Sequence, residues 1–226
     1  MKIGILGTGV VGQTIAGKLA SLGHEVTVGT RDPAATLKKT EKDGMGNAPF
    51  SEWHKSNSKV KLDTFANAAA GAEMVLVATN GMATLDAVKA AGKELDGKVL
   101  MDISNPLDFS KGMPPSLFVT NTDSLGEQVQ KAAPNAKVVK TLNTVNAWLM
   151  VDPGKLQGGD HTMFVCGNDA AAKAKAVSFL KEAFGWKDIM DLGDLTNARA
   201  TEGLVALWAR IFVSTNQPMF AFKVVR

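Results

Sequence analysis

The 226-residue chain contains no tyrosine and only one cysteine, Cys166. A single cysteine excludes an internal disulfide framework, and the absence of tyrosine excludes a catalytic relay of the Ser/Thr–Tyr–Lys kind. The sequence also lacks any apolar run near the ~20 residues that a membrane-spanning helix needs. We therefore expect no membrane segment. Because Cys166 lies within a predicted strand, we also expect its thiol to be buried and unreactive.

Other absences narrow the class of protein further. The three histidines, His24, His54 and His161, are widely separated and none lies in a metal-ligand motif, which predicts no metal site. The formal net charge is +3, but no basic stripe interleaved with aromatic residues indicates nucleic-acid binding. Residues 1–6 form a strand-like run without the basic segment and cleavage site of a secretory signal. We therefore predict a cytoplasmic protein.

Short apolar runs alternate with helix-like stretches along most of the chain, which is typical of βαβ units and predicts a parallel sheet. We interpret the polar residues 40–59 as a long surface loop. The predicted strands are 3–6, 25–30, 62–65, 74–78, 99–103, 138–142, 161–166, 188–192 and a last one at 220–224. The predicted helices are 13–22, 34–39, 125–133, 170–184 and 197–212.

Together these elements predict a Rossmann-type, doubly wound α/β fold with a mostly parallel sheet and a small α+β C-terminal extension. We expect residues 1–149 to form the dinucleotide-binding domain and residues 150–226 a small cap or dimerisation region. The helix at 197–212 has a broad apolar stripe, which suits core packing or a twofold interface, and we expect a homodimer. Core packing is the default expectation for Trp208, with stacking on an acceptor ring as the alternative, whereas Trp148 is expected to form a cleft wall.

A glycine-rich segment lies directly after the first predicted strand and directly before the first predicted helix. It has the pattern G-x-G-x-x-G, as Gly7-Thr8-Gly9-Val10-Val11-Gly12. Gly7 permits a tight turn, Gly9 lets the backbone approach a pyrophosphate, and Gly12 lets helix and strand pack closely. The helix amides then meet the anion. The alternative is a tight turn in a domain that binds nothing, but the complete βαβ context predicts a dinucleotide site.

The end of the second predicted strand indicates which dinucleotide is bound. Proteins that bind NAD usually have an acidic residue there, which bonds the ribose 2′-hydroxyl. Here the strand ends in Gly29-Thr30-Arg31, and the first carboxylate is Asp32. An acid would repel a 2′-phosphate, whereas a hydroxyl beside a guanidinium would bind it. We therefore predict NADP(H), with Thr30 and Arg31 at the 2′-phosphate; the alternative is an ordinary surface arginine.

Polar residues directly follow three other predicted strands. In open parallel sheets the ligand lies outside the carboxyl ends of the strands, so these side chains are expected near the nicotinamide half of the cofactor. Turn formation alone would also explain such asparagines and serines. The three loops are Thr79-Asn80-Gly81, Ser104-Asn105-Pro106 and Asn143-Thr144-Val145-Asn146.

The sequence offers no lysine or histidine where a substrate carbonyl would need a proton, and it contains no G-x-S-x-G motif. A flavin or deazaflavin acceptor removes that need, because the ring accepts the hydride itself and the protein has only to align two rings. We therefore predict a small-molecule hydride acceptor of this kind and assign no catalytic residue.

These motifs, in this order, resemble the NADP-dependent oxidoreductases of the deazaflavin (coenzyme F-420) type, a family similar to the cytoplasmic domain of the six-transmembrane metalloreductases. The resemblance covers nearly the whole chain and implies NADPH in a cleft between a Rossmann domain and a small C-terminal domain. It implies that Thr8, Val10 and Val11 line the pyrophosphate, and that Asn80, Asn105 and Asn143 lie near the nicotinamide. The motifs are 7–12, 29–31, 104–107, 138–144, 164–169, 191–193 and 199–202.

Two other functions remain open from the sequence. A non-catalytic NADP(H)-binding redox sensor or partner module would also have an intact fingerprint and no proton-transfer residue. A hydroxyacid dehydrogenase or imine reductase of the six-phosphogluconate type would resemble the N-terminal half but would add a large all-helical domain. The stretch after residue 142 is short for such a domain and includes strand patterns.

Overall fold

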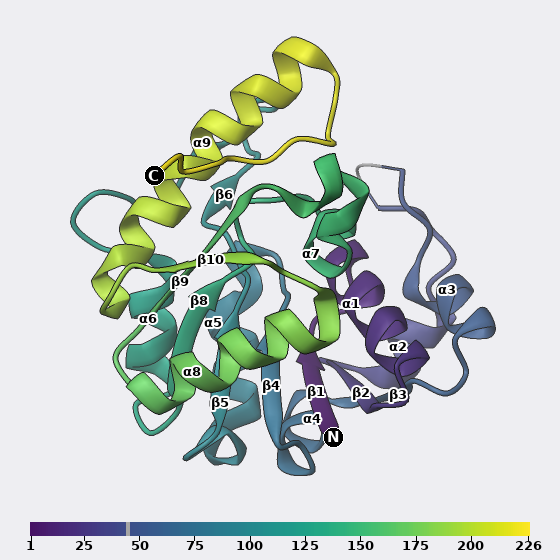
Figure 1. Ribbon diagram of the computed structural model, residues 1–226. Coiled ribbons are helices and arrows are strands. Elements are labelled where there is room, and N and C mark those ends of the chain that lie inside the picture. The colour runs from purple at the N-terminus through teal and green to yellow at the C-terminus, as the bar shows by residue number, and fades with distance from the viewer. Residues whose placement is uncertain (44–45) are drawn as a thin grey trace.

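The computed structural model describes residues 1–43 and 46–226, and its centre is one eight-stranded sheet (Figure 1). The strand order is β10-β9-β8-β5-β4-β1-β2-β3, and every neighbouring pair is parallel except β8 with β9. The predicted mostly parallel Rossmann-type sheet is confirmed. Its strands are β1 (Lys2–Leu6), β2 (Glu25–Thr30), β3 (Lys61–Thr64), β4 (Met74–Val77), β5 (Val99–Asp102), β8 (Lys137–Thr141), β9 (Thr162–Gly167) and β10 (Asp188–Asp191).

Helices cover both faces of the sheet because alternate side chains of each strand point to opposite faces. In β4, Met74 and Leu76 join the core under α1, α7 and α8, whereas Val75 and Val77 join the core under α4, α5 and α6. The helices are α1 (Val10–Ser21), α2 (Pro33–Lys38), α3 (Phe50–Ser56), α4 (Phe65–Ala70), α5 (Gly81–Ala91), α6 (Leu125–Ala132), α7 (Ala147–Val151), α8 (Ala170–Phe179) and α9 (Ala198–Thr215).

The order of the strands creates a crevice at one edge of the sheet. From β1 the chain winds outward through β2 to β3, and it then returns to β4 on the other side of β1. The loops after β1 and β4 therefore diverge, and in open α/β sheets ligands bind at this switch point, outside the carboxyl ends of the strands. The predicted phosphate loop follows β1, and the predicted Thr79–Gly81 loop follows β4.

Two expectations about secondary structure are wrong. Within the predicted loop at 40–59 the structure has α3, whose Phe50 is buried and contacts the rings of Trp53 and His54; residues 44 and 45 lie outside the described residues. Residues 220–224 form no strand: one backbone hydrogen bond joins Thr162 to Phe222, and the segment packs by its aromatic side chains instead.

A small antiparallel ribbon, which the sequence pattern did not predict, lies beside the carboxyl edge of the main sheet. It consists of β6 (Leu107–Asp108) and β7 (Ser116–Leu117). In Figure 1, α9 extends away from the sheet on this side, and the C-terminal segment runs back along it. No helix within residues 1–43 and 46–226 has the length and apolar character needed to cross a membrane.

Candidate active site

The turn from β1 into α1 requires glycine at two positions for structural reasons. Gly7 has a φ of +127°, and a Cβ on Gly12 would lie 2.1 Å from the carbonyl oxygen of Gly7. Gly9 differs, because its φ of −74° suits any residue and a Cβ there would meet nothing within 4 Å. The fold thus explains Gly7 and Gly12, while the exposed Gly9 leaves the N-terminus of α1 open to a ligand.

A hollow of about 270 Å³ lies beside this turn and extends toward α2 and α3. Gln13 supports the turn, since its side-chain amide donates to the carbonyl of Thr8 at 2.9 Å. The sequence did not single out Gln13, Thr36 or Lys39, all of which line the hollow, and Lys39 brings a cation to it. The full lining is Thr8, Gly9, Val10, Gln13, Thr36, Lys39, Glu41, Asp43, Ala48, Pro49 and Phe50.

The tip of β2 has the polarity predicted for a 2′-phosphate site. Thr30 is almost buried and shares a 2.9 Å hydrogen bond with Thr36, so it lies behind the hollow rather than in its wall. The carboxylate of Asp32 caps α2 by accepting from the amide of Ala35 at 2.9 Å. Arg31 is exposed, and its guanidinium makes no hydrogen bond or ion pair within the part of the chain that the structure describes. It is available to an anion.

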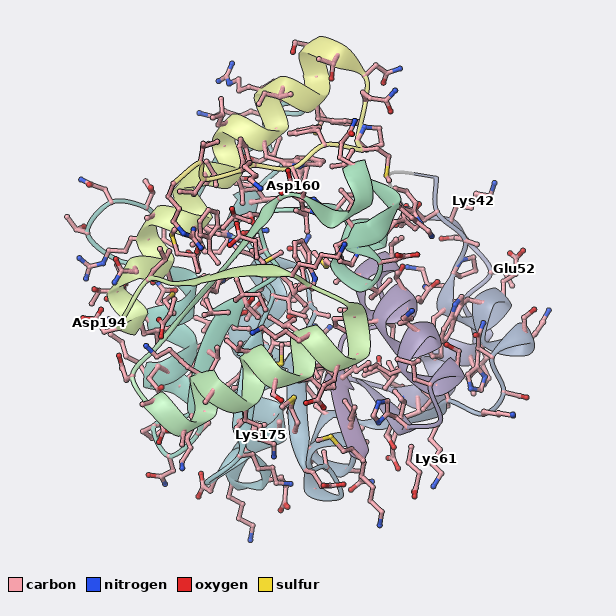
Figure 2. All side chains as sticks on the ribbon, viewed as in Figure 1. Lys42, Glu52, Lys61, Asp160, Lys175 and Asp194 are labelled. Atoms are coloured by element: carbon pink, nitrogen blue, oxygen red, sulfur yellow. The ribbon has the colours of Figure 1, made fainter. Side chains whose placement is uncertain are left out.

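A second cleft, of about 250 Å³, is lined by Val11 and by residues at the carboxyl ends of β4, β5 and β8. The lining has a polar part from the predicted loops, called the polar wall below, and an apolar part that includes Leu107, Phe109, Val205 and Trp208. No charged side chain is among its described lining residues, which are Val11, Ala78, Thr79, Asn80, Gly81, Ile103, Ser104, Asn105, Leu107, Phe109, Asn143, Val145, Asn146, Ala147, Met150, Val205 and Trp208. In Figure 2, by contrast, the charged Lys42, Glu52 and Lys61 extend from the outer surface.

Hydrogen bonds fix the polar wall. Asn105 and Asn143 are joined reciprocally: the Asn105 amide donates to the Asn143 carbonyl at 2.8 Å, and the Asn143 amide donates to Asn105 Oδ1 at 3.0 Å. Asn80 caps α5 by accepting from the amide of Met82, and Thr79 bonds Thr84. Asn80 therefore has a local capping role and also lines the cleft, whereas Asn105 and Asn143 tie two loops together within its lining. A structural hydrogen bond and a place in the cleft lining are therefore compatible at one position.

Not every predicted site residue lines a cavity. Thr8, Gly9 and Val10 line the phosphate-side hollow, and Val11, Thr79, Asn80, Ser104, Asn105 and Asn143 line the second cleft. Gly7, Gly12, Thr30, Arg31 and Pro106 line neither. Pro106 is buried, and its carbonyl accepts from the amide of Phe118, which ties this loop to the β6–β7 ribbon. The structure thus joins most of the predicted residues along one edge of the sheet.

The expectations for two tryptophans are wrong. Trp148, the predicted cleft wall, is 49% exposed and lies outside the lining, whereas Trp208, expected in the core, lines the cleft. The ring of Trp208 stacks on Phe212 and Phe220, with centroid separations of 5.6 and 5.1 Å. Its buried indole nitrogen has no hydrogen-bond partner among residues 1–43 and 46–226. The C-terminal segment supplies Phe220, which explains why sequence periodicity missed this arrangement.

A fully buried ion cluster lies behind the polar wall, and the sequence analysis missed it. Lys140 Nζ contacts Asp102 Oδ2 at 2.9 Å and Glu202 Oε1 at 2.6 Å. Burial lowers the pKa of Lys140, but the two carboxylates more than offset this effect and hold the pKa above its usual value. The available signal was a lysine and an aspartate that directly follow apolar residues in neighbouring strands, Val138-Val139 before Lys140 and Val99-Leu100-Met101 before Asp102.

The single cysteine has the predicted character. Cys166 in β9 is fully buried, and burial raises the pKa of its thiol to about 12. Because the thiolate is the reactive form, a thiol with this pKa is inert near neutral pH. Among the described residues, no group of three or more histidine, cysteine, aspartate or glutamate side chains could hold a metal ion.

The fold, the glycine turn and the cleft at the switch point define a Rossmann-type dinucleotide-binding protein. A family model described as NADP oxidoreductase, coenzyme F420-dependent, matches residues 2–106. The F420-dependent NADP reductase of Methanothermobacter marburgensis is 30% identical over 216 residues, covering 92% of this chain and 90% of that protein. The chain belongs to the family of coenzyme F420-dependent NADP oxidoreductases, as its sequence motifs predicted.

Two further relatives extend the comparison. A crystal structure of a protein from Arthrobacter sp. FB24, provisionally named an F420-dependent NADP-reductase, is 56% identical over 100% of both chains, with a TM-score of 0.94. Metalloreductase STEAP3 of Rattus norvegicus is 28% identical over 204 residues, which cover 90% of this chain. That match spans 36% of STEAP3, so the chain corresponds to about a third of that protein's length.

Proposed function

We propose that this chain is an NADP(H)-dependent oxidoreductase that passes a hydride between NADPH and a deazaflavin or flavin ring, with coenzyme F420 as the first acceptor to test. The observation that carries the proposal is the uncharged cleft, whose lining combines side-chain amides with aromatic and aliphatic groups. Two flat rings can lie face to face in such a cleft. The relatives named as F420-dependent NADP reductases support the same assignment.

Different residues along this edge of the sheet bind different parts of the cofactor. The amide of Thr8 in the turn and the amides of Val10 and Val11 at the start of α1 bind the pyrophosphate, and NADPH, when bound, supplies the hydride. At the adenosine end, Arg31 and Lys39 bind the 2′-phosphate, with Thr30 orienting Thr36. At the other end, amides and hydroxyls hold the nicotinamide half without adding charge; these residues are Thr79, Asn80, Ser104, Asn105 and Asn143.

The cleft lining contains no aspartate, glutamate, lysine or histidine among the described residues, so it offers no side chain that would exchange a proton with a substrate carbonyl near neutral pH. A ring that accepts a hydride directly needs no such group. This chemistry favours a flavin-type acceptor over a carbonyl or imine. The catalytic contribution of the chain is then alignment of the two rings and exclusion of water.

Turnover of the purified protein tests the proposal. NADPH oxidation is followed with F420, FMN, FAD and a ferric chelate as acceptors, and we expect turnover with F420 or a flavin. Trp208→Phe keeps an aromatic ring beside Phe212 and Phe220 but removes the indole N–H, so we expect the acceptor KM to rise about tenfold and the NADPH Kd to stay unchanged. Trp148→Phe, outside the cleft, is the matched control. Tight NADPH binding without turnover on any acceptor would identify a redox sensor instead.

We also propose that residues 150–226 form the cap over the cofactor domain 1–149 and that α9 pairs with α9 of a second copy. The buried face of α9 consists of Ala198, Thr201, Glu202, Val205 and Ala209. Part of the predicted apolar stripe, which suits core packing or a twofold interface, lies on the other side: Leu207 is 51% exposed, and Leu204 and Ile211 are half-buried. Ala200 and Gly203 on this side are small enough for a second helix to approach closely.

A substitution at Gly203 tests the dimer. A Cβ at Gly203 would meet nothing within 4 Å in the single chain, so Gly203→Glu should leave the protomer folded. The substitution would put a charge into the proposed interface. We therefore expect the variant to sediment as a monomer, whereas the wild type sediments as a dimer. Gly71→Glu is the matched control, because a Cβ at Gly71 also meets open space. A wild-type protein that sediments as a monomer would contradict the proposal.

A further inference from the structure

The buried cluster joins three elements that are distant in the sequence. Lys140 is at the end of β8, Asp102 at the end of β5 and Glu202 in the first turns of α9. All three side chains are at most 2% exposed. None of them lines the cleft, so the proposed hydride transfer does not use them directly.

At one end the cluster holds Ser104, which lines the cleft. The Ser104 amide donates to Asp102 Oδ1 at 3.0 Å and its hydroxyl donates to the same oxygen at 2.6 Å. The Ser104 carbonyl accepts from Lys140 Nζ at 2.6 Å. All three hydrogen-bonding groups of this residue are therefore fixed by the cluster, and with them the position of the neighbouring Asn105 in the polar wall.

At the other end the cluster holds α9, which supplies Val205 and Trp208 to the apolar part of the lining. Both oxygens of Glu202 accept backbone amides at the start of α6, from Leu125 at 2.8 Å and from Gly126 at 2.9 Å. Val205 and Trp208 follow about one and two turns further along α9 and line the cleft. The path from the polar wall to α9 thus runs from Ser104 through Lys140 to Glu202.

We infer that Asp102, Lys140 and Glu202 form a positioning unit that couples the cofactor wall of the cleft to the acceptor wall on α9. In this unit, Lys140 sets the distance between the nicotinamide side and Trp208, and an ordered cofactor wall orders the start of α9. The inference rests on the proposed function for its kinetic consequence, but the coupling is a property of the folded chain and can be measured without turnover.

Stability alone does not account for the cluster. A buried ion pair is often no more stabilising than apolar residues of similar volume, although it fixes geometry. The chain also has a separate link between the same two helices, since Arg199 on α9 binds Glu127 on α6 in a bidentate pair at 2.7 and 2.9 Å. That pair docks α9 on α6 without contacting Lys140 or Ser104, so it supplies a control within the molecule.

Three variants distinguish coupling of the polar wall to α9 from simple docking of α9 on α6. Glu202→Gln breaks the unit at α9, and Asp102→Asn breaks it at Ser104. The cluster has one cation and two carboxylates, so each substitution leaves Lys140 paired with one carboxylate rather than exposing a lone buried charge. Glu127→Gln removes an α6–α9 ion pair outside the unit. If one of the two cluster variants fails to fold, the other still tests the inference.

Hydrogen–deuterium exchange is measured for each protein with and without NADP⁺. In the wild type we expect NADP⁺ to slow amide exchange both in the Ser104–Asn105 loop and at residues 198–205 of α9. In Glu202→Gln and Asp102→Asn the α9 effect is expected to disappear, and in Glu127→Gln it is expected to persist. The inference would be overturned if NADP⁺ still slowed exchange in α9 of both cluster variants as it does in the wild type. It would also be overturned if Glu127→Gln lost the α9 effect as completely as the cluster variants do.

Kinetics give a second readout, interpreted only after the wild type has turned over F420 or a flavin. Glu202→Gln should raise the acceptor KM about tenfold while changing the NADPH Kd by less than about threefold, because the cofactor wall stays held by Asp102 and Lys140. Glu127→Gln should match the wild type in both constants. If the wild type binds NADP⁺ but turns over no acceptor, the proposed function fails, and the exchange measurements still decide the coupling.

Discussion

Replacing Gly9 with alanine is expected to abolish measurable NADPH binding while leaving the fold intact. The backbone at Gly9 is acceptable for alanine, with a φ of −74°, and the added Cβ meets no atom of the chain within 4 Å. The methyl group would instead lie over the first amides of α1, where the pyrophosphate must approach. We expect the Kd to rise by on the order of a hundredfold or more, which corresponds to about 2.7 kcal/mol.

Gly12 provides the contrasting variant in the same turn. A Cβ on Gly12 would lie 2.1 Å from a backbone oxygen, so Gly12→Ala must move α1 away from β1 and destabilise the whole protein. Calorimetry with NADPH and thermal unfolding are measured for both variants. We expect Gly9→Ala to unfold near the wild-type temperature and Gly12→Ala to unfold well below it. Wild-type affinity in Gly9→Ala would disprove the phosphate assignment.

Removing the guanidinium of Arg31 is expected to weaken NADPH binding about 10- to 150-fold and to change NADH binding little, because hydrogen bonds to charged groups contribute about 1.5–3 kcal/mol. The nearest acid does not interfere, since the Asp32 carboxylate is occupied as the cap of α2. Arg31 itself forms no bond within the described ranges, so its removal breaks no contact there. The loss should therefore appear only with the phosphorylated cofactor.

Two control variants test whether the effect of Arg31→Ala comes from the shape of the guanidinium or from its charge alone. Arg31→Lys keeps the charge but loses the planar fork, so its NADPH affinity should fall between those of the wild type and Arg31→Ala. Lys55→Ala removes the same charge from an exposed position on α3 and tests for a general effect of net charge. Titration calorimetry with both cofactors measures the outcome. Equal losses for NADPH and NADH would show that Arg31 does not recognise the 2′-phosphate.

Much of the fold could be predicted because its pattern is local. The alternation of apolar strands and amphipathic helices is encoded by neighbouring residues, and the eight strands of the sheet appear where that alternation predicted them. The predicted helix at 13–22 begins three residues earlier at Val10, since Gly9 rather than Gly12 is its N-cap. Helix boundaries depend on capping geometry, which spacing alone does not determine.

The C-terminal third shows where local pattern stops being sufficient. The alternation of Phe220, Phe222 and Val224 suggested a strand, yet the Phe220 ring stacks on Trp208 of α9 and a single described backbone–backbone hydrogen bond joins the segment to the sheet. The apolar stripe of α9 suited either a core face or a twofold interface, and the face that is buried within the chain includes Thr201 and Glu202. A buried glutamate is acceptable there because Lys140 and two α6 amides satisfy it.

The sequence by itself determined the dinucleotide turn at residues 7–12, the polarity of the β2 tip and the loops that form the amide wall. Each of these is set by residues that are adjacent in the chain. The tertiary structure alone decided the Trp208 wall, the Lys140 cluster and the exposed face of α9. These features need contacts between segments that are far apart in the sequence, and such contacts exist only once the sheet has brought its strand ends to one edge.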